Sequence, residues 1–95
     1  MKTRKKFYTY LICSILKNKK SISYAGYTDN LKKRLEKHNT GKGAKFTRGK
    51  KWFLIFKKVF CTKSLAMKFE HRLKKDKKYR KKLIKNFQSK VVILN

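Results

Sequence analysis

The sequence predicts a small α+β domain with three strands and three helices. Three features predict it: two apolar runs separated by a lysine-rich turn, a third apolar run in mid-chain, and helical periodicity after the second and third runs. The 95 residues suffice for one modest core. We expect the order β-β-α-β-α-α, with a basic N-terminal extension over 1–6, the domain over 7–87 and a C-terminal tail over 88–95.

The first two apolar runs predict a β-hairpin. Residues 7–16 are almost continuously apolar, as in a strand buried on both faces, whereas 21–27 show more polar alternation. The first run is too short to span a bilayer, and no small-residue cleavage site follows it. We therefore expect a cytoplasmic protein without a membrane partner.

The segment after the hairpin predicts an amphipathic helix and a loop. Thr28 or Asp29 can cap the helix, Leu31 and Leu35 lie four residues apart on one face, and Gly41 ends the pattern. Glycines among basic residues over 40–51 predict a loop or a short irregular helix.

The second half of the chain predicts one strand and two helices. Aromatic and β-branched residues over 52–60 favour a strand, and Thr62 or Ser64 can cap the helix that follows. The core stripe predicted for this helix consists of Leu65, Ala66, Phe69 and Leu73. The last helix, over 77–87, is expected to bury Tyr79, Leu83 and Phe87, and Val91 to Leu94 add an apolar tail.

The charge of the chain indicates a polyanionic partner. Thirty Lys and Arg face four Asp and Glu, giving a formal charge of +26. Nucleic acid is the natural candidate, although an AT-rich genome would also enrich lysine. Cys13 and Cys61 are too few and too far apart for a zinc site or a disulfide framework, so we expect two small buried thiols.

A few polar residues could carry out phosphodiester cleavage. The candidates, in chain order, are Tyr10, Tyr24, Arg34, His38 and Glu70. Arg34 and His38 lie four residues apart on one helix face, where a guanidinium suits phosphoryl oxygens and a histidine can carry a proton. Glu70 lies at the edge of the apolar stripe, and a lone carboxylate can hold Mg²⁺ when waters and a phosphate complete the octahedron.

Each candidate also has a purely structural interpretation. Glu70 could be a surface carboxylate paired with a lysine, and Arg34 with His38 could belong to a solvated basic face. Tyr10 and Tyr24 could be aromatic core residues of two strands. The hairpin register, which decides whether these tyrosines share a face, does not follow from the sequence.

The residues in this order resemble the GIY-YIG nuclease domain over about 7–87. The resemblance implies the GIY-YIG fold, a three-stranded antiparallel sheet flanked by helices. The triplet Tyr-Thr-Tyr at 8–10 stands where the family has Gly-Ile-Tyr, and Tyr-Ala-Gly at 24–26 stands for Tyr-Ile-Gly. The segment 39–48 is similar to the signature of small stand-alone bacterial GIY-YIG proteins. The resemblance implies a metal-dependent DNA endonuclease, with DNA repair or recombination as its setting, and favours DNA over RNA as the partner.

The resemblance also implies the role of each candidate. Glu70 would bind Mg (or Mn), Arg34 would stabilise the pentavalent phosphate, Tyr10 and Tyr24 would position or deprotonate water, and His38 would support proton transfer. The residues expected to hold the nucleic-acid backbone are Lys42, Lys45, Arg48, Lys74 and Lys75. No small-molecule cofactor is expected. The alternative is a basic DNA- or RNA-binding protein that keeps the fold without catalysis.

Overall fold

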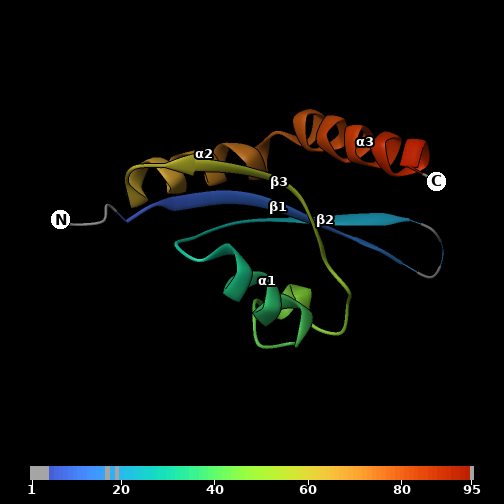
Figure 1. The fold of residues 1–95 in the computed structure, drawn as a ribbon, viewed down its shortest axis with the longest axis horizontal. Helices are drawn as coiled ribbons and strands as arrows, with labels where there is room; N and C mark the ends of the chain where they lie inside the picture. Colours follow the sequence, from blue (N-terminus) through green and yellow to red (C-terminus); the bar gives the residue numbers. More distant parts are fainter. Residues whose placement is uncertain (1–4, 17, 19, 95) are drawn as a thin grey trace.

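The computed structural model describes residues 5–16, 18 and 20–94, and side chains as far as residue 88. The elements follow one another as β1 (Phe7–Ile15), β2 (Ser21–Thr28), α1 (Leu31–Asn39), the short 3-10 helix η1 (Lys45–Thr47), β3 (Phe53–Phe60), α2 (Lys63–Lys75) and α3 (Lys77–Leu94). Figure 1 shows α1 on one side of the sheet and α2 with α3 on the other. The predicted fold class and element order are confirmed.

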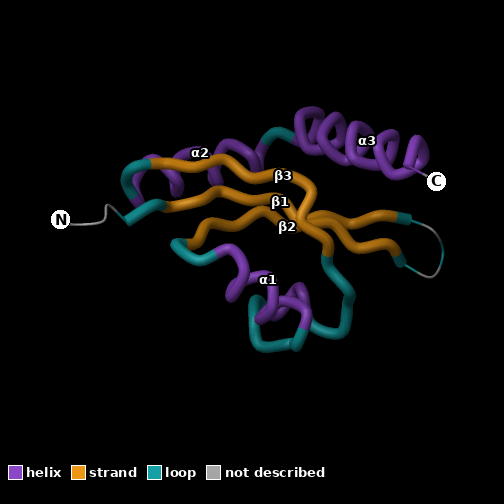
Figure 2. The backbone as a smooth tube through the Cα atoms, in the orientation of Figure 1, coloured by secondary structure: helices purple, strands orange, loops and turns teal. Residues whose placement is uncertain are grey.

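The sheet places β1 in its centre. Its strands lie in the order β2-β1-β3, and both pairs are antiparallel. The tube in Figure 2 shows β1 running between its two neighbours. Because β1 pairs along both edges, and its residues alternate between two helix-covered faces, it is the almost fully apolar strand of the sequence. A register shift between Leu11 and Ile12 interrupts its pairing with β3.

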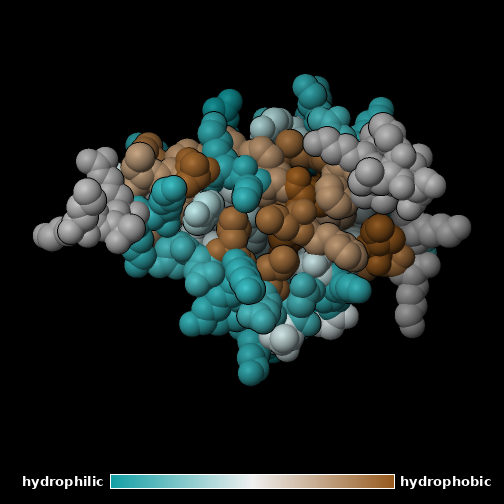
Figure 3. Space-filling model, viewed as in Figure 1, coloured by the Kyte–Doolittle hydropathy of each residue, from teal (hydrophilic) through white to brown (hydrophobic). Residues whose placement is uncertain are grey.

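A small core fills each face of the sheet. On the α1 side, Tyr10, Ile12 and Trp52 are buried, and Leu31 and Leu35 of the helix pack against them. On the other side the buried residues are Leu11, Ala25 and Leu73, contacted by Ile55, Phe56 and Leu83. Each large apolar side chain buried in this way contributes about 1.5–3 kcal/mol. Figure 3 shows hydrophobic residues over the sheet and hydrophilic ones over α1.

Two details of the predicted helical stripes were wrong. Leu65 is 47% exposed, so the stripe of α2 that faces the sheet consists of Ala66, Phe69 and Leu73. Tyr79 is likewise exposed, although its ring meets Phe56 edge to face. Successive residues of a helix point about 100° apart, so the Leu65 side chain turns away from the sheet when its neighbour Ala66 faces it.

The helix ends differ from the expected ones at two places. The N-cap of α1 is Asn30, whose side chain accepts from the Lys33 amide, and not Thr28 or Asp29. Thr62 caps α2 as predicted. Helix α3 continues past Phe87 to Leu94, so the backbone of the predicted tail is helical as far as that residue. The side chains of 89–94, and with them the apolar tail, lie outside the described residues.

The two cysteines differ in environment. Cys13 is buried as predicted, and burial raises the pKa of its thiol. Cys61 is exposed, because it lies in the turn between β3 and α2, so the prediction of a second buried thiol was wrong. Within the described ranges, no helix is both long and apolar enough to cross a membrane.

Candidate active site

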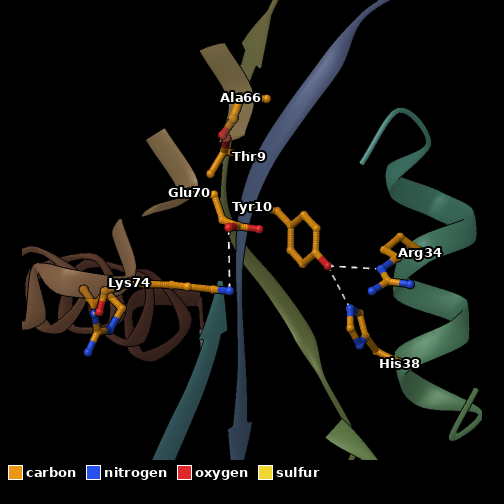
Figure 4. Close-up of polar contacts among 8 residues, drawn as sticks. Thr9, Tyr10, Arg34, His38, Ala66, Glu70 and Lys74 are labelled. Carbon is orange, nitrogen blue, oxygen red and sulfur yellow. Dashed lines mark hydrogen bonds and ion pairs between the residues drawn. The ribbon is translucent and has the colours of Figure 1, made fainter. Parts of the chain in front are cut away.

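A cleft of about 400 Å³ opens where the end of β2 meets α1 and α2. Tyr24 from β2, Arg34 from α1 and Glu70 from α2 line it, together with Lys33 and Lys37. The lining also includes a second tyrosine, Tyr27, and a second carboxylate, Asp29, so the cleft joins aromatic hydroxyls, carboxylates and several cations. Figure 4 shows the Glu70 side chain on one side of Tyr10 and Arg34 with His38 on the other.

The hairpin register places both motif tyrosines on the same face of the sheet. Tyr10 pairs with Gly26, and Ile12 pairs with Tyr24, so the two tyrosines are diagonal neighbours. Gly26 makes this arrangement possible, because a Cβ there would lie 2.5 Å from the Tyr10 Cζ. The question left open by the sequence is thus settled by the strand pairing.

Four side chains form a hydrogen-bonded chain whose proton positions are fixed by its two ends. Arg34 Nε donates to the Tyr10 hydroxyl at 3.4 Å, and the Tyr10 hydroxyl lies 2.8 Å from His38 Nε2. His38 Nδ1 lies 2.9 Å from Thr47 Oγ1, which donates its single proton to the Ala44 carbonyl at 2.7 Å. Thr47 Oγ1 must therefore accept a hydrogen bond from His38 Nδ1–H. This leaves the unprotonated Nε2 to accept a hydrogen bond from the Tyr10 hydroxyl.

Burial keeps both central groups of this chain neutral. Burial raises the pKa of Tyr10, against the opposing effect of Arg34. The pKa of His38 is lowered to about 4, first by burial and then by the Arg34 charge. At neutral pH the hydrogen-bonded chain therefore contains a protonated Tyr10 hydroxyl and an uncharged His38 ring. Both side chains are almost fully buried, behind the cleft rather than in its lining.

The protein is expected to lose stability as the pH falls from 7 to 5, because His38 takes up a proton when unfolded and resists it when folded. With a folded pKa of about 4 and an unfolded one near 6.5, this loss amounts to about 2 kcal/mol at pH 5. Urea unfolding of wild type and His38→Gln at both pH values measures it. An equal pH dependence in the two proteins would contradict the assignment.

Three residues that the sequence analysis missed hold the site together. Thr47 is buried and fixes the His38 tautomer, while its carbonyl accepts from Trp52 Nε1 at 2.8 Å. The side-chain amide of Asn39 accepts a hydrogen bond from the Trp52 N–H and donates one to the Trp52 carbonyl. Thr9 Oγ1 donates to the Ala66 carbonyl at 2.7 Å, which ties β1 to α2. Thr47 lies in the irregular segment, and the exposed Asn39 is the last residue of α1, so no periodicity marks either residue as structurally important.

Glu70 is held at the border of the cleft by the helix that carries it. Ala66, one turn earlier, is fully buried against Thr9, so the next turn of α2 brings Glu70 beside the sheet. Its side chain is 18% exposed, and its Oε1 lies 3.6 Å from Lys74 Nζ. Among the described residues, no cluster of three or more His, Cys, Asp or Glu could hold a metal ion.

The basic residues predicted to bind nucleic acid divide into two groups. Lys74 lies next to the cleft, with its Nζ 5.9 Å from the centroid of the Tyr24 ring. Lys42, Lys45 and Arg48 are exposed in and around η1 and do not line the cleft. Lys75 is also exposed, at the last turn of α2.

Comparison with known proteins places the chain in a family. A family model described as GIY-YIG catalytic domain matches residues 6–84. The UPF0213 protein OB0043 of Oceanobacillus iheyensis is 44% identical over 75 residues, which cover 78% of this chain and 87% of that protein. The UPF0213 protein YazA of Bacillus subtilis is 44% identical over 70 residues, which cover 73% and 71%.

A solved structure is also similar to this chain. The solution NMR structure of the UPF0213 protein BH0048 from Bacillus halodurans is 32% identical and has a TM-score of 0.46, covering 84% of this chain and 83% of that one. The match to the family model extends over most of the sequence and includes all five candidate residues. The chain belongs to the GIY-YIG catalytic domain family.

Proposed function

We propose that the protein is a metal-dependent endonuclease that hydrolyses phosphodiester bonds in DNA. The observation that carries this proposal is that Arg34 and Glu70, from different helices, line one cleft, and that Arg34 is held there by the buried Tyr10 and His38. A protein that used only its charge to bind nucleic acid would need neither the Glu70 carboxylate in the cleft nor the ordered hydrogen-bonded chain.

Arg34 is the group that would stabilise the transition state. Within the described part of the chain, only its Nε has a side-chain hydrogen-bond partner, so Nη1 and Nη2 remain for phosphoryl oxygens. The bond to Tyr10 fixes the plane of the guanidinium before substrate binds. A preorganised cation needs little rearrangement when negative charge develops on the phosphate.

The two tyrosines take different roles in this proposal. Tyr24 lines the cleft and would orient the attacking water. Tyr10 is buried and has a raised pKa, which suits a residue that positions Arg34 rather than one that deprotonates water. His38 accepts a hydrogen bond from the Tyr10 hydroxyl. That bond orients the hydroxyl so that its oxygen can accept a hydrogen bond from Arg34.

The metal implied by the family fits the donors present here. Glu70 offers carboxylate oxygens at the edge of an open cleft, and Mg²⁺ binds through one or two carboxylates while it keeps several waters. Such an ion, Mg²⁺ or Mn²⁺, would neutralise phosphoryl charge and activate water when bound. Lys74 would then exchange its ion pair with Glu70 for contact with the DNA backbone. DNA repair or recombination is the proposed setting.

Arg34→Lys is expected to lower DNA cleavage by about 100- to 1,000-fold, because lysine keeps the charge but loses the donor to Tyr10 and the planar fork. The measurement is cleavage of plasmid, single-stranded and branched DNA in the presence of Mg²⁺ or of EDTA. Arg72→Lys is the matched control, since Arg72 is an exposed arginine of α2 outside the cleft.

The same assay decides between catalysis and simple binding. Metal-dependent cleavage that survives in Arg72→Lys but not in Arg34→Lys supports the nuclease. DNA binding of equal strength by all three proteins, with no cleavage of any substrate, would show that the fold serves as a basic binding module.

A further inference from the structure

A second groove, of about 290 Å³, lies next to the cleft along the outer edge of β2. Its wall consists of Ser23, Tyr24, Ala25, Phe46, Lys74 and Arg80. Tyr24 lines both the groove and the cleft, and Lys74 reaches from the groove to Glu70. A chain of phosphates that passes through the cleft could therefore continue along this edge of the sheet.

Phe46 is the unusual residue of this groove. Its side chain is 53% exposed in a protein whose cores are small, although a ring of this size is normally buried. The ring is stacked on Tyr24, with centroids 6.1 Å apart and planes inclined by 22°, and it is tilted against Trp52 at 6.2 Å. The Tyr24 and Phe46 rings thus form a stepped aromatic surface that is open to solvent at Phe46.

The position of Phe46 is fixed by its neighbours. It lies in η1 directly before Thr47, which is fully buried and bonded to His38, Ala44 and, through its carbonyl, Trp52. The segment that presents the ring is therefore anchored to the same network that holds the catalytic candidates. A rigid, preorganised ring loses little conformational freedom when a ligand stacks on it.

The charges around the groove suit a polyanion. Lys74 and Arg80 are the ionisable side chains of its wall other than Tyr24, and both are cationic. Arg80 Nη1 donates to the Leu73 carbonyl at 2.7 Å and also to the Lys74 carbonyl, which holds the guanidinium at the end of α2. Lys50 Nζ lies 5.5 Å from the centroid of the Phe46 ring. Cations on several sides of an exposed ring are typical of surfaces that stack bases and contact phosphates.

We propose that Phe46 stacks an unpaired DNA base, next to a phosphate bound by Lys74 and Arg80, so that the protein prefers single-stranded or locally unpaired DNA. The base must be unpaired because the faces of a duplex base are covered by its stacked neighbours. The inference deepens the proposed function, since it names the kind of DNA that would enter the cleft, but the stacking itself requires no cleavage.

Binding of a single-stranded oligonucleotide that carries 2-aminopurine tests the proposal, because stacking on an aromatic ring quenches its fluorescence. The assay uses the full chain in EDTA, so it does not depend on nuclease activity. Phe46→Ala is expected to weaken single-strand binding by about 5- to 100-fold and to abolish the quenching. Its effect on a duplex of the same sequence should stay within about twofold, and Phe46→Trp should keep both properties.

Phe53→Ala is the matched control. Phe53 is 43% exposed, has Lys51 Nζ 5.7 Å from its ring, and lies on β3, at the opposite edge of the sheet. Circular dichroism checks that each variant is folded. Equal losses for single strands and duplex in Phe46→Ala, or an effect no larger than that of Phe53→Ala, would overturn the proposal. Quenching by a protein that cleaves no DNA would support base stacking on Phe46 and refute the nuclease. Cleavage with no change in quenching or single-strand binding in Phe46→Ala would support the nuclease and refute the stacking.

Discussion

Replacing Glu70 with glutamine should abolish metal-dependent DNA cleavage, with a loss of at least about 1,000-fold. The amide has the size of the carboxylate but lacks its charge, and the other acidic side chain of the lining, Asp29, is paired with Lys5 at 2.9 Å. A metal ion supplies several kcal/mol of charge stabilisation in phosphoryl transfer. Loss of the ion should therefore lower the rate of the chemical step. DNA affinity should stay equal or rise, because the cleft becomes more positive.

Glu36→Gln provides the control for that change. Glu36 is an exposed residue of α1 and does not line the cleft, so the substitution removes one negative charge from the protein without touching the site. Cleavage rates with Mg²⁺ and DNA affinities in EDTA should be compared for the three proteins. Cleavage by Glu70→Gln at the wild-type rate would mean that the activity comes from a contaminant or that Glu70 does not hold the metal.

Gly26→Ala should lower the free energy of unfolding by about 2–4 kcal/mol. The new Cβ would lie 2.5 Å from Cζ and 3.0 Å from Cε2 of Tyr10, and still closer to its hydroxyl. Tyr10 is packed with Ile12 and Trp52, so the ring cannot move aside without disturbing the core. Displacing the hydroxyl would also leave His38 Nε2 buried without its donor, and would release Arg34.

Chemical denaturation of Gly26→Ala, Tyr10→Phe and the double variant measures these two contributions. Tyr10→Phe removes the hydroxyl and its bonds but adds no atom, so it isolates the hydrogen-bond term. In the double variant the worst overlap is absent, and its loss should be smaller than the sum of the single losses. Ser21→Ala, an exposed change in the same strand, should have little effect. Additive losses would show that Gly26 and Tyr10 are not in close contact.

The fold was predictable because its signals are local. Continuous hydrophobicity marked the central strand, and leucines at helical spacing marked α1. The boundaries were less certain, since several polar residues precede each helix and only the backbone geometry decides that Asn30 caps α1. The helical backbone beyond Phe87 was also missed, because basic residues and a short apolar run give weak periodicity there.

The sequence singled out candidate residues but could not predict the hydrogen bonds among them. Arg34 and His38 lie on one helix face, as their spacing indicates. That Tyr10 is buried while Tyr24 lines the cleft depends on register and on the packing of α1, which no single residue reveals. Thr47 determines the tautomer of His38 from nine residues away across an irregular turn, and a threonine in a basic loop gives no sign of that role.

Two consecutive residues of β1 connect the helices that carry the charged groups. Thr9 bonds the backbone of α2 one turn before Glu70, and Tyr10 bonds Arg34 and His38 of α1 on the opposite face. The helices that carry the carboxylate and the guanidinium are thus both hydrogen-bonded to one strand. A shift of β1 within the sheet would therefore displace both charged groups together.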